Sequence, residues 1–388
     1  MLNARRFITV SGCSLAVLGG GLAASAASAS ADGFPPGQHA PVGHVYVNDN
    51  TTVANTVAGF ERHQDGSLTA LPGSPFSAGG AGSGKGLASQ GALQVTQDGR
   101  YLLAVDAGSN QISVLRLGYN GVPQQVGAPV SSGGIDPNSI AVSGNLVYVE
   151  NAGAGGTNVT GFYLAPWGGL YPLPHSTVTL PEGSSPGDVL FNSTGDKLVV
   201  SLVASSQIAS FDVRFGRLLA APGSPYTGQG LGQLGAEFRP TNPNQLFVSN
   251  AHNGAGLGTV SSYNVNWLGQ LSSIGSSPFA DTQTAPCWVE ISHDGRFLFT
   301  TNTGSGSISS YAISPSGELK YLSTVQAGEK GIGDVDLRLS PDGKTLFVNG
   351  SGADVVAAFA VNGGDLTQLA SSPTPLPAGA IASGIVVN

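Results

Sequence analysis

The sequence repeats one pattern of strands and turns seven times, and this repeat constrains the fold more than any other feature. In each repeat an apolar strand ends in a small or polar residue, a second strand follows, and a Gly turn leads into a third. The strand ends fall about 50 residues apart, at Asn48, Val105, Glu150, Ser201, Ser249, Thr301 and Asn349. This spacing is typical of propeller blades, so the chain is predicted to form an all-β, seven-bladed β-propeller.

Seven glycine turns support the count of seven repeats. Each lies just before the outer strand of a repeat, where a tight hairpin needs the positive φ angle that glycine adopts easily. These glycines are Gly66, Gly121, Gly169, Gly216, Gly269, Gly317 and Gly364. Ser-Pro pairs such as Ser74-Pro75 then end several outer strands, because proline cannot donate to a neighbouring strand. They mark the crossovers between blades.

The two ends of the repeat array are predicted to pair with each other. Six crossovers lead into a short apolar inner strand, for example Asp188 to Phe191 and Asp336 to Leu339. The seventh such segment is at the C-terminus, from Gly384 to Asn388, and the segment that lacks an inner partner is His44 to Val47. Their pairing would close the ring and leave no long unpaired edge.

Composition agrees with a single all-β domain over residues 44–388, preceded by a lead-in at 32–43. The chain has 58 Gly and 24 Pro residues, and only 10% of its residues are charged, so helix signals are scarce. Its 40% of hydrophobic residues, arranged in short runs, can supply a core. A uniform repeat outweighs the two or three domains that length alone would suggest.

The first 31 residues are predicted to be a signal peptide. Arg5 and Arg6 precede an apolar run, and the small residues around Ala29 fit a cleavage site. The Arg pair loosely resembles a twin-arginine signal, so we expect a secreted, extracellular protein. No other stretch approaches the ~20 apolar residues that a membrane span needs.

The charge of the chain limits its partners. The formal net charge is −8, and loss of Arg5 and Arg6 with the signal would make the mature chain more acidic still. An acidic chain is a poor match for nucleic acid or an anionic membrane surface. We expect a monomer that binds a small molecule or a carbohydrate.

Cys287 would be the only thiol left, so no internal disulfide can form, and we expect it to be a small buried side chain.

Several strand ends and turns resemble those of a known family. The relevant segments are Tyr46-Val47-Asn48, Leu246 to Asn250, Phe299 to Asn302, Ser292 to Arg296 and Ser340 to Lys344. Over about residues 40–388 the chain resembles secreted seven-bladed propellers of the lactonase type. That group includes 6-phosphogluconolactonase-like and carboxymuconate-cyclase-like proteins and repeats named for a Tyr-Val-Thr-Asn motif. The resemblance implies this fold and, as an expectation, a lactonase-like hydrolase.

One departure from that family bears on the substrate. Lactonase-like enzymes tend to carry a Gly-Pro-Arg-His-like stretch at the start of an inner strand, which supplies cationic and imidazole groups. The comparable segments here are Ser185 to Asp188, Gly235 to Phe238 and Ala285 to Trp288, and none contains an Arg-His pair. This argues against a sugar phosphate, which would need cations.

Two residues stand out as candidate acids or bases. In a propeller, the crossovers and the loops between second and third strands emerge on one face, and those loops are longest in repeats one, three and five. Glu150 occupies a strand-end position that is uncharged in the other repeats, and His252 lies in the longest loop. Either could transfer a proton. The alternatives are a Glu that bonds a backbone amide and a solvated loop His.

Five further residues are candidate ligand-binding groups. Asp188, Glu237 and Asp336, with Asp334 beside the last, begin inner strands near the predicted axis. Converging carboxylates could hold Ca²⁺, which prefers oxygen ligands and could polarise a lactone carbonyl. They could equally accept hydrogen bonds from buried backbone amides. Trp288 could stack on a ring-shaped ligand at the mouth, or pack between blades.

Two function classes therefore stay open. The first is a hydrolase or isomerase of a lactone or related cyclic ester, with Glu150 or His252 in proton transfer. The second is a non-catalytic exported scaffold that binds a carbohydrate, peptide or envelope partner.

The segment from Gly79 to Lys85 looks like a phosphate-binding loop, but Gly86 replaces the required Ser or Thr. We therefore expect that segment to be a flexible crossover.

Overall fold

The computed structural model describes residues 40–327, 334–350 and 352–388. The predicted signal peptide and most of the lead-in lie outside this part of the chain. The first strand, β1, begins at Pro41. The residues from Pro41 to Asn388 form one compact unit.

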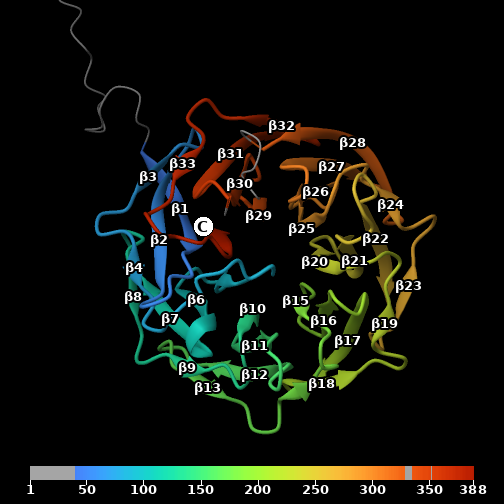
Figure 1. Cartoon of the computed structure of the whole chain (residues 1–388), viewed down its shortest axis with the longest axis horizontal. Helices are drawn as coiled ribbons and strands as arrows, with labels where there is room; N and C mark the ends of the chain where they lie inside the picture. The colour runs from blue at the N-terminus through green and yellow to red at the C-terminus, as the bar shows by residue number, and fades with distance from the viewer. Residues whose placement is uncertain (1–39, 328–333, 351) are drawn as a thin grey trace, which may run out of the picture. The chain divides into compact units, whose positions relative to one another are not determined.

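This unit is a seven-bladed β-propeller, as the repeat predicts. Its strands form seven antiparallel sheets, which follow one another around a common axis in the order of the sequence (Figure 1). The described residues contain no α-helix, and their one helical turn is a 3-10 turn at Ala107–Ser109. None of the described residues forms a helix suited to crossing a bilayer.

Each blade has four main strands, and most blades gain a short fifth strand that pairs with the third. From the inside outward, blade 1 consists of β34 (Ile385–Val387), β1 (Pro41–Asn48), β2 (Thr56–His63), β3 (Leu68–Ala70) and β4 (Phe76–Ser77). Blade 2 consists of β5 (Leu93–Val95), β6 (Tyr101–Asp106), β7 (Gln111–Leu117), β8 (Pro123–Gln125) and β9 (Val130–Ser131). Blade 3 consists of β10 (Pro137–Ser143), β11 (Leu146–Asn151), β12 (Asn158–Leu164), β13 (Leu170–Pro172) and β14 (Val178–Thr179).

Blades 4 to 7 follow the same plan. Blade 4 consists of β15 (Pro186–Phe191), β16 (Lys197–Leu202), β17 (Gln207–Arg214), β18 (Arg217–Ala220) and β19 (Tyr226–Thr227). Blade 5 consists of β20 (Gln233–Arg239), β21 (Asn242–Asn250), β22 (Thr259–Val265), β23 (Leu271–Ser273) and β24 (Phe279–Ala280). Blade 6 consists of β25 (Pro286–Ile291), β26 (Phe297–Asn302), β27 (Ser307–Ile313) and β28 (Leu319–Gln326), and blade 7 consists of β29 (Asp334–Leu339), β30 (Thr345–Gly350), β31 (Val355–Asn362), β32 (Asp365–Gln368) and β33 (Thr374–Pro375).

The predicted closure of the ring is confirmed. The C-terminal strand β34 is the innermost strand of blade 1 and pairs antiparallel with β1, with Tyr46 opposite Val386 and Val47 opposite Ile385. Ile385 and Val386 are buried, so the closing strand adds to the core as well as to the sheet. Burial of two such side chains contributes about 3–6 kcal/mol before the entropy of ordering is subtracted.

The hairpin glycines are placed as predicted in five of the seven blades. Gly66, Gly121, Gly216, Gly269 and Gly317 have positive φ angles. In blades 3 and 7 the positive φ angle falls one residue earlier, at Gly168 and Gly363 rather than at Gly169 and Gly364. Both of those turns contain a Gly-Gly pair, so the sequence identified the turn but not which glycine takes the strained conformation.

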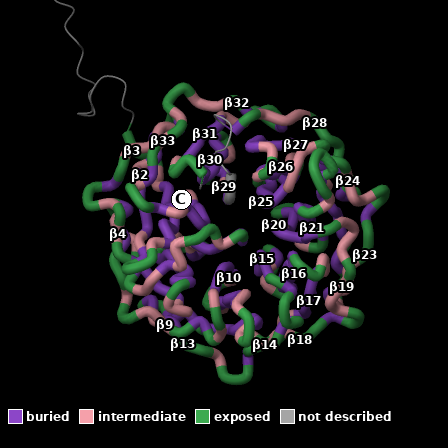
Figure 2. The backbone as a smooth tube through the Cα atoms, in the orientation of Figure 1, coloured by how far each residue is buried: buried purple, intermediate pink, exposed green. Residues whose placement is uncertain are grey.

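The core is divided among the seven junctions between neighbouring blades. Six of the seven buried hydrophobic clusters draw their residues from two adjacent blades, and the one between blades 7 and 1 includes Phe60, Phe347 and Ile385. The seventh, between blades 6 and 7, also includes Val203, Leu234 and Ala251 of blades 4 and 5. Burial is greatest on the inner strands and falls toward the outer ones (Figure 2). The ring is thus stable only as a whole, because each sheet is covered on both faces by its neighbours.

Candidate functional site

The innermost strands bring charged side chains to the axis at two levels. At the first level, Asp188 in β15 pairs with Ser201, and Asp336 in β29 pairs with Asn349, both at predicted strand ends. We call these residues the first layer. Two positions further along equivalent strands are Gln94 in β5, Glu237 in β20, Glu290 in β25 and Arg338 in β29, which we call the second layer.

A small cavity lies on the axis at these two layers. Its volume is about 270 Å³, and its polar lining comes from Gln90, Gln94, Asp188, Glu237, Glu290 and Arg338. This volume is just below the range of pockets for drug-sized ligands, which starts at about 300 Å³. The cavity therefore suits a small molecule such as a single sugar-like ring.

A short stretch of the crossover from blade 1 to blade 2 spans the axis at the first layer. We call Ser89–Gly91 the axial segment. The Gln90 side chain makes two hydrogen bonds with the backbone of Val289 in blade 6, donating at 2.9 Å and accepting at 3.1 Å. The Gln90 backbone N–H donates to Gly187 of blade 4 at 2.8 Å. The light-blue loop beside β6 reaches toward the axis in Figure 1. The axial segment is therefore buried and bonded on both sides, and it lies after Gly79 to Lys85, for which a flexible crossover stays a prediction.

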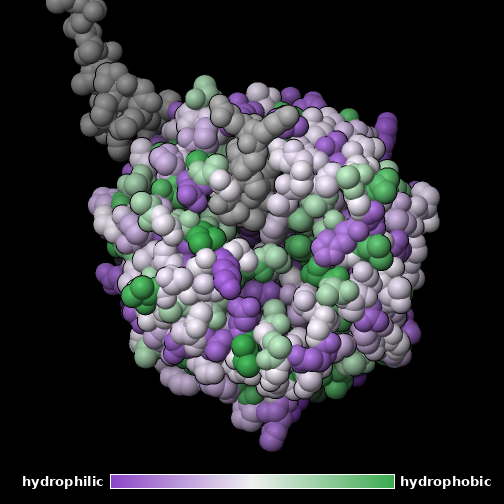
Figure 3. Space-filling view, in the orientation of Figure 1, coloured by the Kyte–Doolittle hydropathy of each residue, from purple (hydrophilic) through white to green (hydrophobic). Residues whose placement is uncertain are grey.

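The axial segment covers the first layer and leaves the second layer accessible. Asp188 and Asp336 are buried, whereas Gln94, Glu237 and Arg338 are partly exposed. The cavity therefore opens along the inner strands, away from the axial segment. The face drawn in Figure 3 is hollowed near the axis.

Arg338 is the cation at the centre of this cluster. Its Nη1 lies 3.2 Å from Oε2 of Glu290 and 3.8 Å from Oδ1 of Asp336, and it also donates to the Leu337 carbonyl at 3.1 Å. Burial disfavours the charged guanidinium, but Asp336 and Glu290 outweigh this effect and raise the pKa of Arg338. Arg338 therefore stays charged.

The acids of the cluster hold their protons more tightly than free carboxylic acids. Withdrawal from water raises the pKa of Asp336 to about 6, although Arg338 opposes the shift. Withdrawal from water, followed by the nearby charge of Glu290, raises the pKa of Glu237 well above its usual value. Burial also raises the pKa of Asp188 and of Glu290. Such groups can exchange protons near neutral pH.

Glu237 differs from the other acids in having no internal hydrogen bond within the described residues. Asp188 accepts from the Ala236 N–H at 2.9 Å, and Glu290 accepts from the Leu339 N–H at 3.0 Å. Asp336 accepts from the Leu337 N–H at 2.8 Å. These three carboxyls thus bond backbone amides, which was the alternative to ligand binding for Asp188 and Asp336. Glu237 is left facing the cavity.

Glu150 lies outside the cavity, buried between blades 3 and 4. Its two carboxyl oxygens find no hydrogen bond of good geometry among the described residues, and neither does Oδ1 of its neighbour Asn138. Burial, and then the charge of Asp188, raise the pKa of Glu150 well above its usual value. The structure therefore places Glu150 near Asp188 but not in contact with the open space.

His252 and Trp288 are also displaced from the cavity. His252 lies exposed in the loop after β21, and its ring makes no hydrogen bond or ion pair with any described residue. Trp288 is buried and donates from Nε1 to the Ser89 carbonyl at 2.7 Å, so it holds the axial segment in place. Stacking of Trp288 on a ligand stays a prediction, and this buried position does not support it.

The predicted calcium site finds no matching arrangement of ligands. Within the described part of the chain, no group of three or more acidic, His or Cys side chains is placed to hold one metal ion. The side chain of Asp334 lies outside the described residues. Cys287 is buried as predicted, and burial raises the pKa of its thiol to about 11, which makes it a poor nucleophile at neutral pH.

Sequence reasoning missed Gln90, Gln94, Glu290 and Arg338. The signal for the second layer was present. When the inner strands are aligned on their strand-end partners, the positions equivalent to Glu237 hold Glu290 and Arg338 in the next two blades. A charged residue between apolar neighbours at a repeated position indicates a shared location near the axis. Gln90 carried no such signal, because its contacts are 199 residues distant in sequence.

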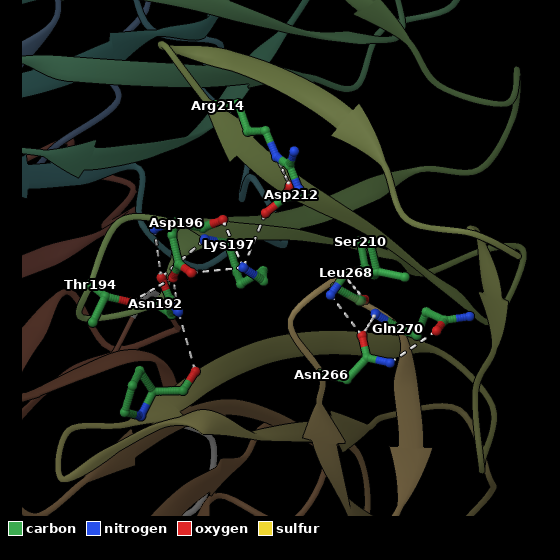
Figure 4. Close-up of polar contacts among 12 residues, drawn as sticks. Asn192, Thr194, Asp196, Lys197, Ser210, Asp212, Arg214, Asn266, Leu268 and Gln270 are labelled. Atoms are coloured by element: carbon green, nitrogen blue, oxygen red, sulfur yellow. Dashed lines mark hydrogen bonds and ion pairs between the residues drawn. The ribbon is translucent and has the colours of Figure 1, made fainter.

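A second charge cluster lies in blade 4, where Lys197 at the start of β16 pairs with Asp212 of β17 (Figure 4). Lys197 of β16 lies 2.7 Å from Oδ2 of Asp196 and 3.1 Å from Oδ1 of Asp212, and Arg214 pairs with the other oxygen of Asp212. We call these four residues the blade-4 cluster.

A groove of about 450 Å³ near Arg100 and Tyr119 is larger than the axial cavity, but its charged side chains are exposed and its residues do not converge on one point.

Comparison with known proteins supports the resemblance inferred from the sequence. Residues 239–380 match the family described as Lactonase, 7-bladed beta-propeller, in agreement with the seven blades of the structure. The chain is thus similar to lactonase-type propellers. No curated protein matches the sequence.

Solved structures show the same architecture at low sequence identity. A candidate 6-phosphogluconolactonase from Bacteroides uniformis superposes with a TM-score of 0.72 at 17% identity, covering 89% of this chain and 99% of that one. The periplasmic gluconolactonase of Pseudomonas aeruginosa gives a TM-score of 0.70 at 18% identity, covering 89% and 98%. A protein from Lactobacillus plantarum gives 0.70 at 17%, covering 89% and 99%. These likenesses establish the fold.

Proposed function

We propose that the chain hydrolyses a small lactone or related cyclic ester in the axial cavity. The observation that carries this proposal is the placement of Glu237, a carboxyl with no internal hydrogen bond among the described residues, in the same cavity as the charged Arg338. A carboxylate and a fixed cation around one small space are the groups that ester hydrolysis needs. The similarity to lactonase-type propellers adds support at the level of the fold.

In this proposal Glu237 acts as the base and Arg338 stabilises negative charge. The Glu237 carboxylate takes a proton from water as the water oxygen attacks the lactone carbonyl carbon. The carbonyl oxygen becomes an oxyanion, which accepts a hydrogen bond from the Arg338 guanidinium. When the ring C–O bond breaks, the departing oxygen takes the proton from Glu237, and the product is the open-chain hydroxy acid.

The experiment is a panel of lactones followed by proton release in weak buffer. We expect Glu237→Gln to lower kcat/KM by at least about 100-fold, because general-base catalysis contributes 10²–10⁴-fold. Glu182→Gln, a matched change at an exposed glutamate, is the control and should leave the rate unchanged. Because the pKa of Glu237 is raised, its base form appears only above its usual titration range. The rate should therefore rise with pH through an inflection above about 4.5.

Glu150→Gln and His252→Ala belong in the same panel, since proton transfer by Glu150 or His252 remains a proposal. A rate that falls with either of these changes and not with Glu237→Gln would move the reaction away from the axial cavity. If no lactone is hydrolysed by the wild type, or if turnover is indifferent to all three changes, the hydrolase proposal is wrong.

A second candidate function is carbohydrate binding by a non-catalytic scaffold. An apolar groove of about 300 Å³ between blades 2 and 3 is lined by Val114, Val130, Trp167 and Tyr171. The Trp167 and Tyr171 side chains are 67% and 50% exposed, and exposed aromatic faces can stack on sugar rings. Quenching of tryptophan fluorescence by oligosaccharides, lost in Trp167→Ala, would support it. No change with any glycan of a broad array would exclude it.

We also propose that the chain is exported. The support is the Arg5-Arg6 pair followed by an apolar run and small residues near Ala29. N-terminal sequencing of protein recovered outside the cells is the test. A mature chain that starts near Ser30 or Asp32 is expected, and an intact Met1 on all of the protein would contradict export.

A further inference from the structure

The geometry points to an uncharged, hydroxyl-rich lactone as the ligand of the axial cavity, with phosphorylated and carboxylated lactones rejected. This inference rests on the proposed function, since it concerns the same cavity. It is opposite to what similarity to a candidate 6-phosphogluconolactonase would suggest, because that substrate carries a phosphate. This preference follows from which charged side chains face the cavity and from which of them are already paired.

The cavity offers a single cation, and that cation is already paired. Among the described residues that line it, Arg338 is the only Lys, Arg or His, and three are acids. Arg338 contacts Glu290 at 3.2 Å, Asp336 at 3.8 Å and the Leu337 carbonyl at 3.1 Å. His293 lies near Glu290 but on an exposed turn outside the lining. A second anion would have to compete for Arg338 with carboxylates held in place by the fold.

A phosphate group needs several donors, and the rest of the lining does not supply them. Phosphate sites use paired Arg side chains, helix N-termini or converging backbone N–H groups. Here Glu290 already accepts the Leu339 N–H and Asp188 accepts the Ala236 N–H. Glu237 repels a dianion when ionised and offers a single O–H when protonated. As long as any one of the acids is ionised, the cavity has no net positive charge to attract a dianion.

Hydroxyl groups, in contrast, match the two side chains that remain available. Glu237 and Gln94 are partly exposed in the cavity, and neither side chain has a hydrogen bond with another described residue. A carboxylate accepts from hydroxyls, and a primary amide both donates and accepts. A ligand with several hydroxyls could satisfy both groups while its carbonyl oxygen accepts from Arg338.

The test compares two unreactive analogues by calorimetry on the full mature chain, so that binding is read without turnover. The probes are δ-gluconolactam and its 6-phosphate. We expect the uncharged lactam to bind at least about tenfold more tightly, a difference worth about 1.4 kcal/mol. Glu290→Gln releases Arg338 from one carboxylate without changing side-chain size, so this variant should bind the phosphate at least about tenfold better than the wild type does. Glu182→Gln is the matched control and should keep the wild-type preference.

Each outcome bears on the inference. Equal or tighter binding of the phosphate by the wild type overturns it, and so does failure of both probes to bind. Should Glu290→Gln fail to fold, judged by circular dichroism, Glu237→Gln replaces it and should weaken lactam binding by about tenfold. Selective binding of the lactam together with no hydrolysis of any lactone would uphold the inference about the ligand and defeat the proposed function.

Discussion

The two charge clusters of this propeller are built from similar residues but have opposite balances. The axial cluster, formed by Asp188, Glu237, Glu290, Asp336 and Arg338, has four acids and one cation. The blade-4 cluster has two acids and two cations, paired at 2.7 and 3.1 Å around Lys197 (Figure 4). In the blade-4 cluster Lys197 and Asp212 are buried while Asp196 and Arg214 are exposed, so the two clusters differ both in how their charges are matched and in their access to water.

This difference appears directly in the acids. In the blade-4 cluster, burial is outweighed by hydrogen bonds from Lys197 and Thr194, which lower the pKa of Asp196 to about 2, and the pKa of Asp212 is lowered as well. In the axial cluster, burial dominates and the pKa of every acid is raised. Matched charges stabilise a fold, whereas unmatched buried acids cost stability and are typical of functional sites. The raised pKa values of the axial acids therefore support the proposal that the axial cavity is the functional site, and the paired charges of blade 4 support a structural role there.

The largest effect is expected where the unmatched cluster loses its one cation. Arg338→Met leaves Glu290 and Asp336 buried without a counter-charge. We expect it to lower the free energy of unfolding by about 3–5 kcal/mol, the usual cost of removing one partner of a buried pair. Urea unfolding at pH 7 measures it.

Arg338→Lys provides the control, because it keeps the charge and should recover part of the loss. If Arg338→Met unfolds at the same urea concentration as the wild type, the acids around it must be uncharged at pH 7. In that case the axial cavity would contain no unmatched negative charge at pH 7.

A smaller loss is expected in the matched cluster. Lys197→Met removes a side chain that is only 4% exposed, but Arg214 remains to neutralise Asp212, and Asp196 can turn to water. We expect a loss of about 2–3 kcal/mol, measured by urea unfolding. Because the pKa of Asp196 is lowered, its pairing stabilises the fold above about pH 4 and is lost toward pH 2. The difference from wild type should shrink over that range, and a constant difference would contradict the pairing.

The fold could be predicted from the sequence because every blade repeats the same local constraints. Strand ends, hairpin glycines and apolar inner strands each recur, so an error in one repeat is corrected by the other six. The pairing of β34 with β1 followed from counting, since one inner strand was missing at the start and one was left over at the end. Local patterns thus determined the architecture.

The site was predicted only in part, because it depends on contacts that repeat patterns do not encode. Asp188, Glu237 and Asp336 were predicted near the axis, and they lie on the innermost strands β15, β20 and β29, although Glu237 lies in the second half of β20 rather than at its start. The axial segment could not be foreseen, because its bonds join Gln90 to Val289 and Gly187 in other blades. It covers the face where Trp288 was expected to meet a ligand, and this contact decides which layer of acids is accessible.

The smallest effect concerns Glu150, the buried acid that neither cluster neutralises. Because its pKa is raised in the folded state, the folded chain holds a proton that the unfolded chain releases above about pH 4.5. Wild-type stability should therefore decline as pH rises from about 4.5, and Glu150→Gln removes this cost. We expect the variant to gain about 1 kcal/mol at pH 7 and nothing at pH 4, by urea unfolding at both values. The amide of the Glu150→Gln side chain can also donate to the unsatisfied Oδ1 of Asn138. Glu182→Gln, at an exposed site, should change stability at neither pH. A loss at pH 7 that shrinks toward pH 4 would instead mean that the carboxylate of Glu150 is stabilised by a partner in the folded protein, and Glu150 would then belong with the matched charges of blade 4.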